Sequence, residues 1–298
     1  MLSGCFEEAW RESDRIAARG RPDPHRLWDG LPFAGKRVVI RCLHGLGDAI
    51  QFIRYVRLVR RGASRVTVQT HPELVSLIRS MALVDDVISW SDDGCIQWDQ
   101  QIEVMELPRA FRTTLETVPA EVPYLAVESC RREHCRVPPR RGKNPRIGLQ
   151  WRSGEYNPER SIPAEELCPI LKIPGMDFYT FQRGPHRGDL HHLDVASSVY
   201  DVSGESPEIL EAAADLMNID LLITADTMLA HLAGALGVAV WVLLPFAADW
   251  RWMLDRKDTP WYPTMKLFRQ PSPGDWGPAV RQIVTALLEH QGFSVGAD

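Results

Sequence analysis

The sequence predicts an α/β protein made of two Rossmann-like, doubly wound domains that face each other across a cleft. Three observations predict this fold. Short apolar, β-branched runs alternate with stretches of helical spacing, as in sheets whose parallel strands are joined by helices. The alternation is interrupted once, by a polar, basic and proline-broken stretch over residues 129–145. The length of 298 residues is enough for two domains of about 100–200 residues each.

The first half is predicted to begin with a short amphipathic helix over residues 5–19, followed by an irregular segment rich in proline and glycine. The spacing of apolar residues then predicts a core strand, a glycine turn and a helix. In chain order, the predicted elements are a strand over Arg37–Leu43, a helix over Ala49–Arg60, a strand over Arg65–Thr70, a helix over Pro72–Met81 and a strand over Asp86–Trp90.

The second half repeats this order after the polar stretch. A tryptophan- and proline-rich stretch over 245–276 precedes a closing helix over Pro278–His290. Pro278 stands near the first turn of that helix, a position at which proline is tolerated. Most of those tryptophans are expected to pack in the core. The other predicted strands are Arg146–Trp151, Asp177–Gln182, Leu221–Thr224 and Val238–Leu244, and the other helices lie near Pro163–Leu171, near Glu208–Met217 and from Thr227 onward.

The polar stretch predicts a boundary between an N-terminal domain over residues 1–135 and a C-terminal domain over residues 136–298. Ligands of open parallel sheets bind at the carboxyl ends of the strands. We therefore expect the functional site between the two domains.

The charge balance argues against a nucleic-acid partner. The chain has 34 basic and 39 acidic side chains, a net charge of -5, and a pI near 6.0, which gives no large positive field for phosphates. No apolar run approaches the roughly 20 residues that span a bilayer, and the first residues lack a signal-peptide pattern. The expected compartment is the cytoplasm, including a peripheral position at the inner membrane.

The six cysteines are scattered and form no CxxC pair, which favours reduced thiols over a disulfide framework or a zinc site. Cys130 and Cys135 flank His134, but a zinc site needs four ligands and no second cluster supplies them. The sequence therefore predicts a solvated linker at this place and no metal site.

The turn Gly45-Leu46-Gly47-Asp48 follows the first strand and opens a helix. It is not a dinucleotide-binding turn, because Ile50 occupies the third small-residue position and the second strand ends without an acid. Two interpretations of Asp48 remain open. As a general base, it would take a proton from a substrate hydroxyl. As the N-cap of a helix that starts at Ala49, it would satisfy free backbone N–H groups.

The second turn runs from Asp226 to His231, after a buried strand and at the start of a helix of small residues. Free N–H groups and a partial positive charge at that helix N-terminus suit a diphosphate over Thr227 and Met228. Asp226 would then bind a hydroxyl or cap the helix. His231 falls one turn into the helix, close enough to reach the same ligand or to be satisfied by local hydrogen bonds.

Together these motifs resemble the heptosyltransferase-like glycosyltransferases of family 9, in the bacterial branch often fused to tetratricopeptide repeats, which are absent here. The resemblance extends from about residue 28 to residue 288 and is much more specific than any single motif. The segments that carry it are the runs over 45–55 and 226–237, Asp249-Trp250-Arg251-Trp252, Trp261-Tyr262-Pro263 and Gly274-Asp275-Trp276.

The resemblance implies a GT-B fold and an inverting, metal-independent transfer without a cofactor. The donor would be a nucleoside-diphosphate sugar, ADP-heptose in the best-known members. The acceptor would be a saccharide, a lipid-linked glycan or a protein. Two other functions stay open on this fold: a non-catalytic nucleotide- or carbohydrate-binding module, and a nucleotide-sugar epimerase or hydrolase.

The resemblance also assigns roles to individual residues. Asp48 takes the place of the general base, behind the turn glycines Gly45 and Gly47. Arg160 stands where the family has a phosphate-binding lysine, which keeps the charge but changes its geometry. Arg152 stands where a hydroxyl is usual, and Arg251 is a further candidate donor contact. The implied donor-binding residues are Ser153, Arg160, Gln182, Asp226, Thr227, Met228 and His231, of which Met228 and Gln182 depart from the usual pattern.

Overall fold

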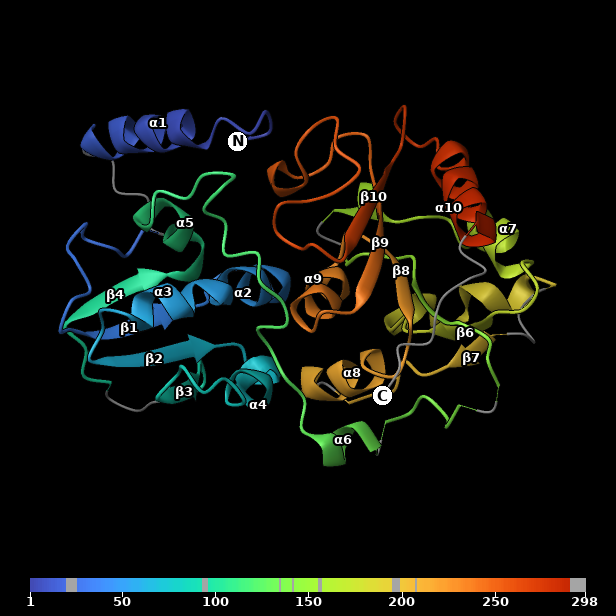
Figure 1. Cartoon of the computed structure of the whole chain (residues 1–298), viewed down its shortest axis with the longest axis horizontal. Coiled ribbons are helices and arrows are strands. Elements are labelled where there is room, and N and C mark those ends of the chain that lie inside the picture. Colours follow the sequence, from blue (N-terminus) through green and yellow to red (C-terminus); the bar gives the residue numbers. More distant parts are fainter. Residues whose placement is uncertain are drawn as a thin grey trace.

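The computed structural model contains two parallel β-sheets, one in each half of the chain (Figure 1). The predicted boundary between residues 135 and 136 falls in the connection between the sheets and stays a prediction. Cys95, His134 and His290 lie outside the described residues. The structure describes residues 1–19, 26–92, 96–133, 135–140, 142–154, 157–194, 199–206 and 208–289.

The first sheet has the strand order β3-β2-β1-β4. All neighbouring strands are parallel, and the chain reverses its direction across the sheet between β1 and β4. Three of the strands were predicted. The polar run Gln100-Gln101-Ile102-Glu103 was not, because it lacks the β-branched residues that mark the others. The strands are β1 (Arg37–Arg41), β2 (Arg65–Thr70), β3 (Asp86–Ser89) and β4 (Gln100–Glu103).

The helix after β1 begins earlier than the sequence predicts. Gly45 has extended backbone angles and is the N-cap, so α2 starts at Leu46 and Asp48 is its third residue. The Asp48 carboxylate accepts a hydrogen bond from the Gly45 N–H at 3.1 Å. The interpretation of Asp48 as the N-cap is therefore wrong. The helices of this half are α1 (Phe6–Ala18), α2 (Leu46–Phe52), α3 (Val56–Arg60), α4 (Val75–Ile78) and α5 (Leu107–Ala110), with 3₁₀ turns at Ile53–Tyr55, Pro72–Leu74 and Val104–Glu106.

The second sheet has the order β10-β9-β8-β5-β6-β7, again with all neighbours parallel. Its reversal point lies between β5 and β8. The sequence did not predict β7, which is short and at the edge, or β10, which lies within the tryptophan-rich stretch. The strands are β5 (Arg146–Gln150), β6 (Asp177–Thr180), β7 (Val199–Asp201), β8 (Leu221–Ala225), β9 (Ala239–Leu244) and β10 (Met265–Arg269).

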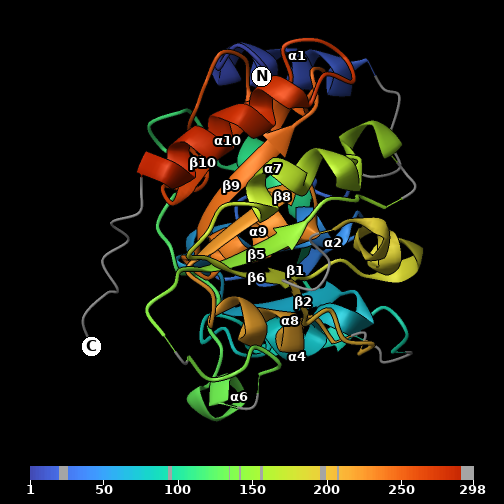
Figure 2. The ribbon, with the colours of Figure 1, turned by 90° about the vertical axis from the view of Figure 1, so that its right-hand side faces the viewer.

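Helices cover both faces of the second sheet. The apolar side chains of α7 and α10 form one core cluster with the sheet, and those of α8 and α9 pack on the opposite face. Figure 2 shows α7 and α10 together beside β10, with α8 on the other side of the strands. None of the helices described is long and apolar enough to cross a membrane. The helices are α6 (Ser129–Glu133), α7 (Cys168–Leu171), α8 (Ile209–Leu216), α9 (Met228–Ala235) and α10 (Gly277–Glu289), with 3₁₀ turns at Pro158–Arg160, Ala164–Leu167, Gly184–His192 and Trp250–Trp252.

The larger core cluster continues from the first half into the second, which fixes the two halves against each other. Trp252 and Trp261 are buried in it, as predicted for most tryptophans of their stretch. Gly47 of α2 faces α9 so closely that an added Cβ would lie 3.1 Å from the His231 ring and 3.4 Å from the Met228 Cα. Glycine at position 47 therefore permits the two helix N-termini to meet.

The buried Arg54 also connects the two halves of the chain. Arg54 is 1% exposed, and its guanidinium donates to the carbonyls of Gln51 and Trp261 and to the Tyr124 hydroxyl. It also lies 4.3 Å from the centre of the Tyr262 ring. Such a cation is stable in a core only when every N–H finds an acceptor or an aromatic face.

Candidate functional site

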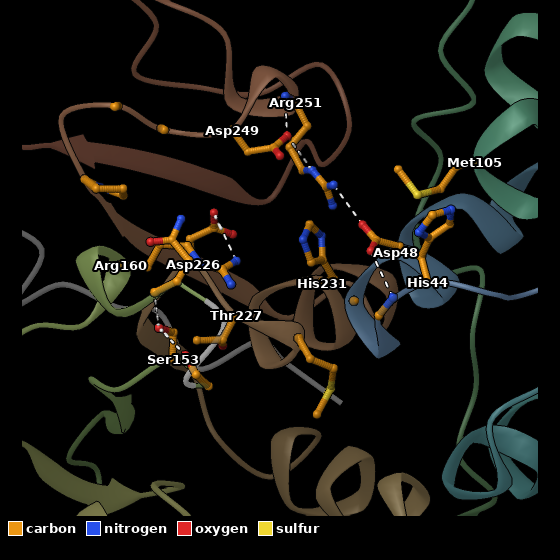
Figure 3. Close-up of a pocket in the computed structure, with 18 residues that line it drawn as sticks. His44, Asp48, Met105, Ser153, Arg160, Asp226, Thr227, His231, Asp249 and Arg251 are labelled. Atoms are coloured by element: carbon orange, nitrogen blue, oxygen red, sulfur yellow. Dashed lines mark hydrogen bonds and ion pairs between the residues drawn. The ribbon is translucent and has the colours of Figure 1, made fainter. Parts of the chain in front are cut away.

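A cavity of about 710 Å³ lies where the reversal points of the two sheets face each other (Figure 3). This is the place at which open parallel sheets bind ligands. Residues that follow five strands of the two sheets line it. They are His44, Gly45, Gly47 and Asp48 after β1, Met105 after β4, Ser153, Gly154, Asn157 and Arg160 after β5, Asp226, Thr227, Met228 and His231 after β8, and Pro245, Ala247, Ala248, Asp249 and Arg251 after β9.

The candidate base, the two turn glycines, six of the seven implied donor-binding residues and the further candidate Arg251 all line this cavity, and Gln182 is the exception. The Gln182 side chain is buried and its oxygen accepts from the backbone N–H of Arg152 at 2.9 Å and of Trp151 at 3.3 Å. Its amide donates to the Arg183 carbonyl. Gln182 therefore holds the loop after β5 in place and does not face the cavity.

Asp48 is joined to the second half by Arg251. The Arg251 guanidinium donates to Asp48 at 2.8 Å, to Asp249 at 2.8 Å and to the buried amide oxygen of Gln51 at 2.8 Å. Burial acts to lower the pKa of Arg251, but the carboxylates of Asp249 and Asp48 outweigh it and hold that pKa above its usual value. Figure 3 shows Arg251 reaching across the cavity to Asp48.

Asp226 and Arg160 form a second ion pair, on the other side of the cavity. The Asp226 carboxylate is almost fully buried and lies 3.8 Å from the Arg160 guanidinium. Burial raises the pKa of Asp226, and Arg160 opposes that rise. Asp226 does not cap α9, because Thr227 is the N-cap and its hydroxyl accepts from the Leu229 N–H at 3.2 Å.

Three neighbours that the sequence did not single out, Gln150, Asn157 and Ser161, position the hydroxyl groups of Thr227 and Ser153. The Thr227 hydroxyl donates to the Gln150 side chain at 2.6 Å. The Ser153 hydroxyl donates to the Asn157 carbonyl at 2.8 Å and lies 3.1 Å from the Ser161 hydroxyl. Gln150 ends β5, next to β8, so the strand pairing sets the position of Thr227.

His231 lies at the base of the cavity, in surroundings that favour its neutral form. Burial lowers its pKa well below the usual value, and the nearby guanidinium groups of Arg251, Arg54 and Arg160 lower it further. Its Nδ1 lies 3.0 Å from the Tyr262 hydroxyl, and its ring stacks on Trp252 with centroids 5.3 Å apart. The ring orientation is therefore fixed from the side opposite Gly47.

A second carboxyl group stands behind the first-half wall of the cavity. Glu103, at the end of β4, is 1% exposed and accepts hydrogen bonds from the N–H groups of Met105 at 2.6 Å and Leu43 at 3.4 Å. Desolvation raises its pKa to about 7. Glu103 was not predicted as a residue near the site, because the strand that ends with it, β4, was not predicted.

The raised pKa of Glu103 predicts a pH dependence of stability. Between its ordinary value of 4.5 and about 7, the folded chain binds this proton and the unfolded chain does not. The free energy of unfolding should therefore fall by about 3 kcal/mol as the pH rises through that window. In Glu103→Gln, which does not titrate, this contribution should be absent. Denaturant unfolding of both proteins at pH 5 to 8 measures it, and parallel curves would contradict the prediction.

The described residues include no group of three or more His, Cys, Asp or Glu side chains arranged to hold a metal ion.

No family model matches this sequence. A curated relative is Protein FlbA of Caulobacter vibrioides, 25% identical over 328 aligned positions that cover 97% of this chain and 53% of FlbA. The chain thus spans about half the length of that relative.

Solved structures of glycosyltransferases have the same fold. The family 9 glycosyltransferase of Veillonella parvula matches with a TM-score of 0.64 and 15% identity, over 87% of this chain and 98% of that one. The ADP-heptose LPS heptosyltransferase II of E. coli matches with a TM-score of 0.62 and 13% identity, over 87% and 100%. TibC of enterotoxigenic E. coli, an iron-containing dodecameric glycosyltransferase, matches with a TM-score of 0.56 and 17% identity, over 83% and 65%. The predicted fold, two facing α/β domains of GT-B type, is confirmed.

Proposed function

We propose that this chain is a glycosyltransferase that moves a sugar from a nucleoside-diphosphate donor to a hydroxyl group of an acceptor. One observation carries the proposal: a single cavity has the Asp48 carboxylate on its first-half wall, and Arg160 and the N-terminus of α9 on its second-half wall. Transfer of a glycosyl group needs a base at one end of the reacting bond system and positive groups at the other.

In the proposed reaction, Asp48 accepts the proton of the acceptor hydroxyl. The hydroxyl oxygen forms a bond to the anomeric carbon from the face opposite the diphosphate, and the bond from that carbon to the diphosphate oxygen breaks, which inverts the configuration. Arg160 and the free N–H groups at the start of α9 stabilise the negative charge of the departing diphosphate. Thr227, fixed by Gln150, stands beside them.

Because Asp48 is paired with Arg251, we propose that the donor also frees Asp48 for the acceptor. The Asp48 Oδ1 accepts a hydrogen bond from the Arg251 guanidinium at 2.8 Å, which occupies an oxygen that an acceptor hydroxyl would need. A diphosphate in the cavity competes with Asp48 for Arg251, so donor binding would release the base for the acceptor. Arg251 thus belongs with the donor-binding residues of the proposal.

For the donor we propose an ADP-sugar, with ADP-heptose first, because the E. coli heptosyltransferase II of the same fold is an ADP-heptose enzyme. We also propose that transfer needs neither metal nor cofactor. TibC contains iron, so the point needs its own test. Transfer that persists in EDTA would support metal independence, and transfer restored only by an added metal would contradict it.

The donor site predicts a specific loss of nucleotide binding in Arg160→Met. ADP should raise the melting temperature of the unaltered chain, because a ligand at 100 times its Kd adds about 2.7 kcal/mol of stability. Removal of a charge-assisted hydrogen bond costs about 1.5–3 kcal/mol, so Arg160→Met should bind ADP roughly 10- to 100-fold more weakly. Thermal shifts over an ADP titration measure both.

The matched control is Arg256→Met, which removes a guanidinium paired with Asp258 outside the cavity and should leave the ADP shift unchanged. UDP, GDP and CDP, free and as sugar conjugates, complete the panel. If no nucleotide shifts the melting temperature, the proposed donor site is wrong.

Two alternatives are distinguished by product analysis. The Asp48–Arg251 ion pair, which occupies the base, is the observation that favours a non-catalytic binding module, and such a module would bind nucleotide without turnover. A nucleotide-sugar hydrolase or epimerase would convert the donor with no acceptor present. We place the protein in the cytoplasm, including a peripheral position at the inner membrane, a proposal that the free thiols of Cys5, Cys42, Cys135 and Cys168 support.

A further inference from the structure

Side chains at the carboxyl ends of the first sheet form a row that continues past the cavity. In the order β4-β1-β2-β3, the row consists of Met105, His44, His71 and Trp90, each one to three residues after the end of its strand. The first two line the cavity. His71 and Trp90 lie farther along the same edge, and the two strand spacings from His44 to Trp90 add up to about 10 Å.

Direct contacts connect this row to the cavity. The His71 Nε2 lies 2.6 Å from the His44 carbonyl oxygen, and the His71 ring is 3.8 Å from the Trp90 ring, centre to centre. The Trp90 N–H donates to the Thr70 carbonyl at 3.0 Å, which holds its backbone at the end of β2. We call His71 and Trp90 the edge pair. Backbone and ring contacts fix the edge pair beside the cavity rim.

The edge pair exposes aromatic surface that the core does not use. Trp90 is 41% exposed, whereas Trp252 and Trp261 of the second half are buried. An exposed aromatic ring beside polar groups at a cavity rim is typical of a binding surface for ligands with both apolar and polar sides. Sugar rings have this character, because their C–H groups lie on the ring faces and their hydroxyl groups lie around the edge.

We infer that the edge pair is a subsite for a sugar ring of the acceptor, so that the acceptor is an oligosaccharide. The inference rests on the proposed function. With the acceptor hydroxyl at Asp48, the saccharide passes His44 and places a more distant ring on Trp90. That path is longer than one sugar ring, so a monosaccharide would reach Asp48 but leave the edge pair empty.

Trp98 provides a matched control for Trp90. It is 40% exposed, nearly the same fraction. It precedes β4, however, so it comes from the opposite end of the sheet, and its ring lies under the Arg41 guanidinium at 4.8 Å. Loss of Trp98 removes the same type of exposed ring, whose cation partner Arg41 is not a member of the row.

The experiment measures binding of the whole chain to an array of linear oligosaccharides, two to four units long, built from hexoses, hexosamines and heptoses. The unaltered chain should bind some of the longer saccharides. Trp90→Ala should weaken that binding at least tenfold, Trp90→Phe should restore most of it, and Trp98→Ala should stay within twofold. Binding to no saccharide, or equal losses in Trp90→Ala and Trp98→Ala, would overturn the inference.

The ADP thermal shift, measured on the same samples, separates this inference from the proposed function. It should be equal in all four proteins, which also shows that each variant is folded. Saccharide binding that fails while the ADP shift persists removes the edge-pair subsite and leaves the donor site. Loss of the ADP shift from the unaltered chain would contradict the proposed function itself.

Discussion

Asp48→Asn is expected to lower the rate of sugar transfer by about 10²–10⁴-fold, the usual contribution of a general base, while ADP still binds. Asparagine has nearly the same shape and its oxygen still accepts from the Gly45 N–H, so α2 should keep its first turn. It does not take up the acceptor proton. The measurement is ADP release from ADP-heptose, with the saccharides retained on the array as acceptors, beside a thermal shift with ADP.

Asp249→Asn is the control, because Asp249 is the other carboxylate that pairs with Arg251. Asp249→Asn removes one of the two ion pairs of Arg251 but leaves the Asp48 carboxylate in place. We therefore expect the rate of sugar transfer to change less than tenfold. Equal losses in the two variants would mean that Asp48 acts through Arg251 and not as the base. Full transfer by Asp48→Asn would exclude Asp48 from the reaction.

Arg136→Met is expected to destabilise the fold by about 3–5 kcal/mol, because it leaves the buried Asp215 carboxylate without its cation. Asp215 is 1% exposed, and Arg136 donates to it from its backbone N–H at 2.6 Å and from its guanidinium at 2.8 and 2.5 Å. Burial raises the pKa of Asp215 even with Arg136 present. The loss should therefore be larger at pH 8 than at pH 5, where protonation relieves it.

The control is Arg140→Met, in the same connecting segment. Arg140 makes two hydrogen bonds to Asp220, but both side chains are about 30% exposed, so the expected loss is below about 1 kcal/mol. Denaturant unfolding followed by circular dichroism compares the two variants. If Arg136→Met lowers the free energy of unfolding no more than Arg140→Met does, the burial of Asp215 does not determine how much the Arg136–Asp215 pair stabilises the fold.

The sequence was sufficient to predict the parts of the site that lie on one short segment. The turns at 45–48 and 226–231 each follow an apolar strand, so residue type and position along the strand predicted both. Arg251 was identified only as a candidate donor contact. Its bond to Asp48 joins residues 203 positions apart, a distance over which local spacing carries no information.

The missed elements have local physical causes. Three of the four residues of β4 are polar, so it lacks the apolar pattern of a strand, and β10 lies in a stretch in which Trp and Pro obscure the alternation of a strand. Gln182 was predicted as a donor contact because it ends a strand at the correct edge. Position at that edge does not determine which way a side chain points, and this one hydrogen-bonds the neighbouring loop.

Arg54 limits how the two halves of the molecule can move. Its buried guanidinium belongs to the first half, and its acceptors include Tyr124 in the connection and the Trp261 carbonyl in the second half. Separation of the halves at this depth would break the bonds to Tyr124 and Trp261 and leave this buried cation only the Gln51 carbonyl, at a cost of several kcal/mol. Arg54 therefore opposes any motion that would separate the two halves of the molecule at this depth.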